Sequence, residues 1–422
     1  MDGTVRAERR RRCLHSRISA GLTGGTCGLV ILLLLATLLL SGNGCREEDV
    51  GRPSIRIGAV LPMSGKRASY GRDALNGILA AVEKINRSGG LDGRQIDLIV
   101  IDNLSMPEET LEAVARFDER GVVAIIGPLA SRNALVASRE AQERGIPIVL
   151  PAATLGGVTS PGEYVSRICF TNEFQGRVLA HFAVTFLKAK TFALVTETGS
   201  FYSRELARYF VNAVESSGCR ITWRGEYRSR QEDFHDLVAS LRTVEADAVF
   251  LPGYYGEVRA FLEQARESGL EIPVLGGDGW DVPFLADSPR GVSTDNYCGA
   301  HFAPDEPTEA VAEFTRHYTT KYGYAPHSLA ALGYDSIWFV TDAVGRSSGG
   351  GREDLKNAIN STRGFRGLTG TLSLDAKRDG VKSAVILKTT PLGFDFIDRI
   401  DPRAVGVEDT LYTPVPVETL SS

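Results

Sequence analysis

The sequence lacks the short motifs that mark metal-dependent and phosphate-dependent enzymes. Its six His residues form no HExxH pattern, and it has no P-loop and no Cys or His pairs at metal-binding spacing. A GxSxG string occurs at residues 345–349, but it follows a helical stretch, whereas a nucleophile elbow joins a strand to a helix. We therefore expect no enzyme activity, no catalytic residue, no metal and no cofactor.

Cysteine is scarce as well. Of the six Cys residues, three lie within the first 45 residues. The other three are widely spaced and odd in number: Cys169, Cys219 and Cys298. In an oxidising compartment two of them could form a disulfide, and three buried thiols are an equally good interpretation; the spacing does not choose between these.

The chain has no excess of positive charge, and its formal net charge is −5. Proteins that bind nucleic acids usually present a basic face, so we expect no nucleic-acid partner. The one strongly basic stretch is residues 2–17, which hold six Arg against Asp2 and Glu8.

An apolar run, Gly28–Leu40, follows this basic start, and no charge lies between Arg17 and Arg46. A basic segment before such a run is typical of a secretory signal. Cys45 follows a small residue, as in a lipoprotein signal whose Cys is lipidated, although Gly42 stands where that pattern expects Leu. Simple cleavage and an uncleaved anchor stay open, because the uncharged stretch is long enough to span a bilayer. We expect an extracytoplasmic protein with a signal at 1–45, a tether at 46–54 and a tail at 401–422.

Short apolar runs alternate with stretches of helical periodicity from residue 55 onward. Strands are predicted at 55–61, 96–101, 122–126 and 146–150, with helices at 70–86, 108–120 and 133–144 between them. A further strand candidate lies at 164–170. Repeated βα units predict a parallel sheet that is buried on both faces.

The βα pattern then starts again. Helices are predicted at 175–186, 203–216, 234–244 and 256–267, and strands at 191–195, 220–227, 248–251 and 272–275. Helices at 308–322, 328–344 and 352–360 come next, and they could return to cover the first half. Residues 370–388 alternate around an Asp-containing turn and predict a hairpin. The fold class is therefore α/β in two halves.

An ordered series of sequence fragments extends from residue 55 to residue 397. It comprises PMSG…YG, NRSGGLDG, GPLAS, PAAT, GSFYSRELA, PGYYGE, GGDGW and LGYDS. In this order the chain resembles the periplasmic leucine/isoleucine/valine-binding proteins. The resemblance implies a two-lobed, hinged type I fold, with lobe 1 at 55–171 and 299–360 and lobe 2 at 172–298 and 361–400. It also implies capture of an amino acid for the permease subunits of an ABC importer.

The resemblance assigns polar ligand contacts to four residues. Ser131 of GPLAS would bind the ligand carboxylate, and Ala152 and Thr154 of PAAT would contact the ammonium and carboxylate. Asp278 of GGDGW would neutralise the ammonium from the second lobe. Each has a simpler interpretation: Ser131 could cap a helix, Thr154 could be a loop hydroxyl, and Asp278 could serve its Gly-rich turn.

Aromatic residues are expected to line the same cleft. The resemblance places Tyr202, Tyr254 and Tyr334 there, and Tyr70 is a further candidate; packing at an interface is the alternative for each. Asp102, at a strand end, is expected to be structural.

The chain also departs from the family. A disulfide of the branched-chain binders is replaced here by Ser105 and Ala130, and Asp278 stands where those proteins usually carry Glu. The expected ligand is therefore an amino acid or a close analogue. A sensor of the same fold, and a binder of amides, urea or aromatic acids, are the alternatives.

Overall fold

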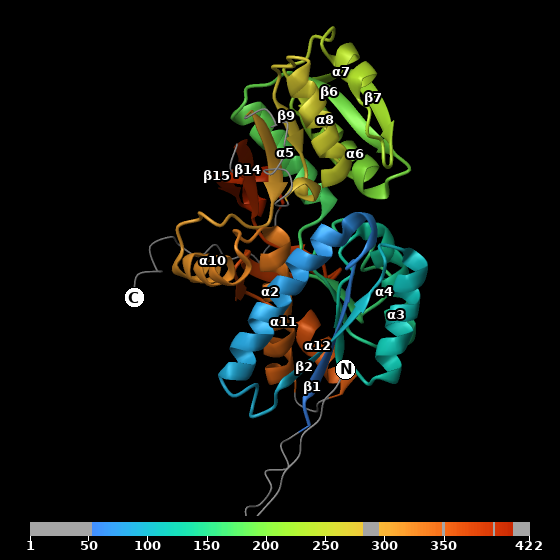
Figure 1. Ribbon diagram of the computed structural model, residues 1–422, viewed down its shortest axis with the longest axis vertical. Coiled ribbons are helices and arrows are strands. Elements are labelled where there is room, and N and C mark those ends of the chain that lie inside the picture. The colour runs from blue at the N-terminus through green and yellow to red at the C-terminus, as the bar shows by residue number, and fades with distance from the viewer. Residues whose placement is uncertain (1–52, 282–294, 348–350, 391–392, 408–422) are drawn as a thin grey trace, which may run out of the picture. The chain divides into compact units, whose positions relative to one another are not determined.

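Two β-sheets, each with helices on both faces, form the core of the computed structural model (Figure 1). The structure describes residues 53–281, 295–347, 351–390 and 393–407, which fall within one compact unit, Arg52–Ser422. The predicted signal, most of the tether, Cys45 and residues 408–422 lie outside the described residues. No helix in the described ranges is both long and apolar enough to span a membrane.

The first sheet contains five parallel strands in the order β2-β1-β3-β4-β5. Their bounds are β1 Ile55–Leu61, β2 Ile96–Asp102, β3 Ala124–Ile126, β4 Ile148–Leu150 and β5 Val165–Arg167. Side chains of β1 alternate between two cores: Ile57 and Ala59 lie in one, and Val60 lies in the other. This alternation is the two-residue period of a strand that is buried on both faces.

Helices from both ends of the chain cover this sheet. On the Ile57 face lie α2 (Ala68–Arg87), α11 (Ser328–Arg346) and α12 (Arg352–Asn360). On the Val60 face lie α3 (Pro107–Glu119) and α4 (Ser131–Glu143). The helix α10 (Glu309–Tyr322) packs beside α2 and α11 through Phe314 and Tyr318.

The second sheet has seven strands in the order β15-β14-β10-β9-β8-β6-β7. The bounds are β6 Thr191–Thr198, β7 Arg220–Arg228, β8 Ala248–Phe250, β9 Val274–Gly276, β10 Asn296–Ala300, β14 Ala384–Thr390 and β15 Gly393–Ile400. The strands β6 to β10 are parallel, and β14 and β15 add an antiparallel edge. One face packs against α5 (Asn172–Thr185) and α6 (Phe201–Ser216), and the other against α7 (His235–Leu241) and α8 (Tyr255–Glu267).

The remaining elements are short. The strands β11 (Phe365–Gly367), β12 (Gly370–Leu374) and β13 (Gly380–Val381) form a small antiparallel sheet. Single 3-10 turns are η1 (Gly65–Arg67), η2 (Asp278–Trp280) and η3 (Pro402–Val405).

The α/β fold with parallel sheets is confirmed, and the predicted ends of most elements differ from the observed ends by one to three residues. The stretch 361–400 departs from its expected place in lobe 2, because Leu372 and Leu374 pack in the core of the first sheet, while Ala384 and Ile386 pack in that of the second. The hairpin predicted over 370–388 pairs only β12 with β13; after Val381 the chain leaves to join the second sheet.

The three cysteines of the described region are free. Cys169 and Cys298 are buried and Cys219 is half-buried. The sequence left open a disulfide or three buried thiols. Within the described region the structure has three free thiols, of which two are buried.

The helices α2 and α11 approach each other closely where glycine removes a side chain, and Figure 1 shows them side by side. A Cβ at Gly77 would lie 1.8 Å from the carbonyl oxygen of Ala330, and one at Gly333 would lie 2.3 Å from that of Ala74. Two backbones in contact cannot yield as a flexible side chain does.

We therefore expect Gly77→Ala to lower the free energy of unfolding by roughly 1–3 kcal/mol or more, measured by urea denaturation. Gly256→Ala is the matched control, because a Cβ at this helical position meets nothing within 4 Å. There the change should be below about 1 kcal/mol and favourable. Equal effects of the two substitutions would contradict the contact.

Candidate functional site

A small cavity lies at the carboxyl ends of strands from both sheets. Ten residues line it: Tyr70, Leu129, Ala130, Ser131, Ala152, Tyr202, Tyr254, Asp278, Gly279 and Leu329. Most come from the segments that directly follow β3, β4, β6, β8 and β9. Open α/β sheets bind ligands at this edge. Six of the eight predicted ligand residues thus line one cavity.

Ser131 is the first residue of α4. Ala130 occupies the N-cap position and makes no side-chain cap hydrogen bond, so Ser131 does not cap this helix. Ser131 is only 3% exposed and lines the cavity. The positive end of the α4 dipole and a hydroxyl donor therefore lie together, which suits a carboxylate.

The PAAT loop is stabilised by the buried side chain of Arg167. The Arg167 Nη1 atom donates to the carbonyl oxygens of Ala153 and Leu155, at 2.9 and 2.8 Å. Ala152 lines the cavity. Thr154 does not line it, although its Oγ1 atom is buried and has no hydrogen-bond partner among the described residues.

Asp278 is positioned by two side-chain donors that meet at one of its oxygens. The Tyr202 hydroxyl donates to Oδ1 at 2.8 Å, and the Gln175 Nε2 atom donates to it at 3.0 Å. Burial, and then the charge of Asp278, hold the pKa of Tyr202 well above its ordinary value, so the hydroxyl keeps its proton. Gly277 makes this approach possible, because a Cβ there would lie 2.5 Å from the Tyr202 hydroxyl oxygen.

The second oxygen of Asp278 faces a buried histidine. The His301 Nε2 atom lies 3.6 Å from Oδ2, beyond a good hydrogen bond. The ring stacks on Phe170 with centroids 3.8 Å apart, and neither ring nitrogen has a hydrogen-bond partner in the described part of the chain. Burial lowers the pKa of His301, although Asp278 acts in the opposite direction. The ring is therefore neutral near pH 7, which leaves Oδ2 able to accept from a ligand.

Three predicted aromatic residues form one cluster. The rings of Tyr202 and Tyr254 stack with centroids 4.9 Å apart, and Tyr70 lies 6.2 Å from Tyr254. The Tyr70 hydroxyl donates to the Gly279 carbonyl oxygen, next to Asp278. This bond joins α2, which covers the first sheet, to η2, which follows a strand of the second.

Tyr334 does not belong to this cluster. Its ring packs on Phe314 at 5.0 Å and lies 6.2 Å from Trp338, between α10 and α11. It is not among the residues that line the cavity. The expectation that it lines the cleft is therefore wrong in this structure, because the helical face that carries Tyr334 is turned toward α10.

Asp102 has the expected structural role. Its Oδ1 atom accepts from the backbone N–H groups of Met63, Ser64 and Leu104, and its Oδ2 atom accepts from the Ser64 hydroxyl. These bonds tie the end of β2 to the loop after β1.

Sequence reasoning missed Gln175 and His301. Gln175 lies on the apolar face of α5, four residues before Leu179, so a polar side chain at that spacing was an available indication. His301 directly follows β10, a strand that was not predicted. In the described ranges, no three His, Cys, Asp or Glu side chains gather as metal ligands would.

Comparison with known proteins identifies the family of this chain. Residues 54–387 match the profile of the family described as "periplasmic binding protein". The chain belongs to this family. Among its relatives, the Leu/Ile/Val-binding protein BraC3 of Rhizobium johnstonii is 28% identical over 75% of this chain and 87% of its own length.

Solved structures of periplasmic binding proteins share the fold. The leucine-binding protein LivK of Thermotoga maritima is 32% identical, with a TM-score of 0.78 over 83% of this chain and 99% of that one. The branched-chain amino-acid binding protein LivJ of Streptococcus pneumoniae, in complex with isoleucine, is 28% identical, with a TM-score of 0.77 over 82% and 99%. The two-lobed type I architecture is thereby shown.

The buried His301 generates a prediction about pH. Its folded pKa lies below that of the unfolded chain, so between these two values the unfolded state binds more protons, and stability falls as the pH drops through this window. We expect His301→Gln to reduce the loss of unfolding free energy between pH 7.5 and pH 5, measured by urea denaturation at both values. His181→Gln, at an exposed position, should leave the pH dependence as it is. A His301 variant with the wild-type pH slope would contradict the burial argument.

Proposed function

We propose that this periplasmic binding protein captures an amino acid between its two sheets and delivers it to an ABC importer. The proposal rests on one observation. Ser131 at the N-terminus of α4 and the braced carboxylate of Asp278 line the same cavity. The proposal includes no catalytic step.

A zwitterion needs this combination of groups. Moving two charges out of water is costly unless each meets an opposite or hydrogen-bonding group. The hydroxyl of Ser131 and the amide end of α4 would hold the ligand carboxylate, with the Ala152 region beside them. The Oδ2 atom of Asp278 would accept from the ammonium. Hydrogen bonds to charged groups contribute roughly 1.5–3 kcal/mol each, so a few of them support micromolar binding.

The names of the relatives point to the same ligand class. BraC3 of Rhizobium johnstonii carries the name of a Leu/Ile/Val-binding protein, and the LivJ structure holds isoleucine. Asp278 is one methylene shorter than Glu, so the ligand ammonium would lie closer to the second sheet than it would with Glu at this position.

Ligand capture would act through a shift between open and closed arrangements. The cavity measures about 30 Å³, far below the roughly 300 Å³ or more of typical ligand sites, so side chains or whole sheets must move to admit an amino acid. Contacts that cross the cleft include Tyr70 to Gly279 and the Lys66 Nζ atom to the Ser229 hydroxyl at 3.0 Å. The ligand shifts this equilibrium only by its difference in affinity for the two arrangements.

We expect Asp278→Ala to weaken amino-acid binding at least tenfold, because the ligand ammonium would lose its charged partner. The measurement is calorimetric titration with the twenty amino acids, after the protein has been unfolded and refolded to remove carried-over ligand. Asp236→Ala, at an exposed position on α7, is the control and should bind like the wild type. An unchanged dissociation constant would remove Asp278 from the site, and binding only of an amide, urea or an aromatic acid would replace the amino acid as ligand.

We also propose an extracytoplasmic location, a lipid tether at Cys45 and docking on permease subunits. Family membership supports the location; the tether rests on the sequence alone. Mass spectrometry of the membrane-bound protein should find a mature N-terminus at Cys45 that carries diacylglycerol, and Cys45→Ser should release the protein or leave the signal attached. A mature N-terminus elsewhere, without lipid, would contradict the tether.

A further inference from the structure

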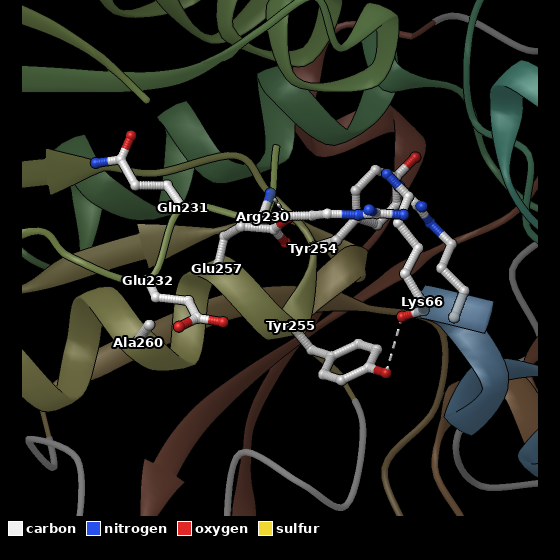
Figure 2. Close-up of a pocket in the computed structure, with 10 residues that line it drawn as sticks. Lys66, Arg230, Gln231, Glu232, Tyr254, Tyr255, Glu257 and Ala260 are labelled. Carbon is white, nitrogen blue, oxygen red and sulfur yellow. Dashed lines mark hydrogen bonds between the residues drawn. The ribbon is translucent and has the colours of Figure 1, made fainter. Parts of the chain in front are cut away.

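A second and larger cavity adjoins the proposed amino-acid site. It measures about 250 Å³ and is lined by Lys66, Arg67, Arg230, Gln231, Glu232, Tyr254, Tyr255, Gly256, Glu257 and Ala260. Tyr254 lines both cavities. In Figure 2, Lys66 approaches from one side, while Arg230, Glu257 and Tyr255 approach from the other, and the Tyr255 hydroxyl donates to the Lys66 carbonyl oxygen. A ligand side chain that moves the Tyr254 ring would therefore enter this second cavity.

Arg67 lies against Tyr254, the residue that both cavities share. Its guanidinium carbon lies 3.8 Å from the centroid of the Tyr254 ring, a favourable cation–π distance. Its Nε atom is buried and has no hydrogen-bond partner among the described residues. A buried donor without a partner costs free energy that a ligand acceptor could recover.

An acceptor without a partner interacts electrostatically with residues that line this cavity. Glu197, at the end of β6, is 5% exposed, and its Oε2 atom has no partner in the described ranges. Burial, and then the charge of Glu257, raise the pKa of Glu197, while Arg67 and Lys66 act in the opposite direction. Glu197 thus interacts with three residues that line the second cavity.

The charges around this cavity balance. Three cations, Lys66, Arg67 and Arg230, and two acids, Glu232 and Glu257, line the cavity. Glu197 does not line it but interacts with its lining residues and adds a third acid. A ligand group with a net charge of either sign would meet attraction and repulsion together. A neutral group that both accepts and donates hydrogen bonds can pair with the donor of Arg67 and with the acceptor of Glu197 that lack partners among the described residues.

We propose that the second cavity is a side-chain subsite that selects an amino acid whose side chain ends in a carboxamide. The carbonyl oxygen of that group accepts from Arg67, and its NH₂ group donates to Glu197. Arg67 is the specificity-determining residue. This inference rests on the proposed amino-acid function and extends it by naming the side chain.

The test compares three ligands of nearly equal size. Methionine, glutamine and glutamate are titrated calorimetrically into the refolded protein. Glutamine should bind at least tenfold more tightly than either of the others. Arg67→Met should lower the affinity for glutamine at least tenfold and leave that for methionine equal or higher. Glu197→Gln, a second variant, should weaken glutamine relative to glutamate.

Arg204→Met is the matched control, because Arg204 is exposed and lies over the ring of Phe201 at 5.7 Å, outside the residues that line either cavity. It should bind all three ligands like the wild type. Tightest binding of methionine or glutamate, or an Arg67→Met variant that still prefers glutamine, overturns the subsite while the amino-acid site stands. Binding of no amino acid at all overturns both.

Discussion

The hydrogen bonds that orient Asp278 determine what the cavity can hold. An ionised carboxylate only accepts hydrogen bonds. The Tyr202 hydroxyl and the Gln175 Nε2 atom both donate to the Oδ1 atom of Asp278. The other oxygen faces a histidine that burial keeps neutral. The Oδ2 atom of Asp278 is therefore left as an open acceptor, and in the proposed function the ammonium group of the ligand would be its partner.

This arrangement depends on elements far apart in the sequence. Gln175 lies on α5, Tyr202 on α6, Asp278 on η2 and His301 after β10. All four adjoin the second sheet, whose parallel strands end at one edge. Tyr70 then contacts the Gly279 carbonyl from the first sheet's side. Burial of both sheet faces leaves the strand ends as the place where polar groups can gather.

The alternation of strands and helices was predictable because strands buried on both faces produce short apolar runs between helical stretches. The family resemblance assigned Ser131, Ala152, Tyr202, Tyr254 and Asp278 to the site. They line one cavity because they follow strands whose carboxyl ends meet at one edge. The position of Tyr334 was not predictable, because packing with Phe314 decides which face of α11 is turned toward α10. The split of 361–400 between two cores has the same origin: β12 and β14 are both apolar, and pairing, which the sequence does not show, assigns each to its sheet. His301 was hidden because the short strand before it carries no clear pattern.

The ring of Tyr254 lies between the two cavities' key residues, since it contacts both the Asp278 environment and Arg67. It stacks on Tyr202, which orients Asp278, and it carries the Arg67 guanidinium on its surface. Any movement of this ring that enlarges the first cavity also alters the contact with Arg67 in the second. In the proposed function, capture of the ammonium and selection of the side chain would therefore be coupled through one aromatic group. A branched-chain side chain would need only apolar surface beside Tyr254. The buried Arg67 Nε donor would then stay without a hydrogen-bond partner among the described residues.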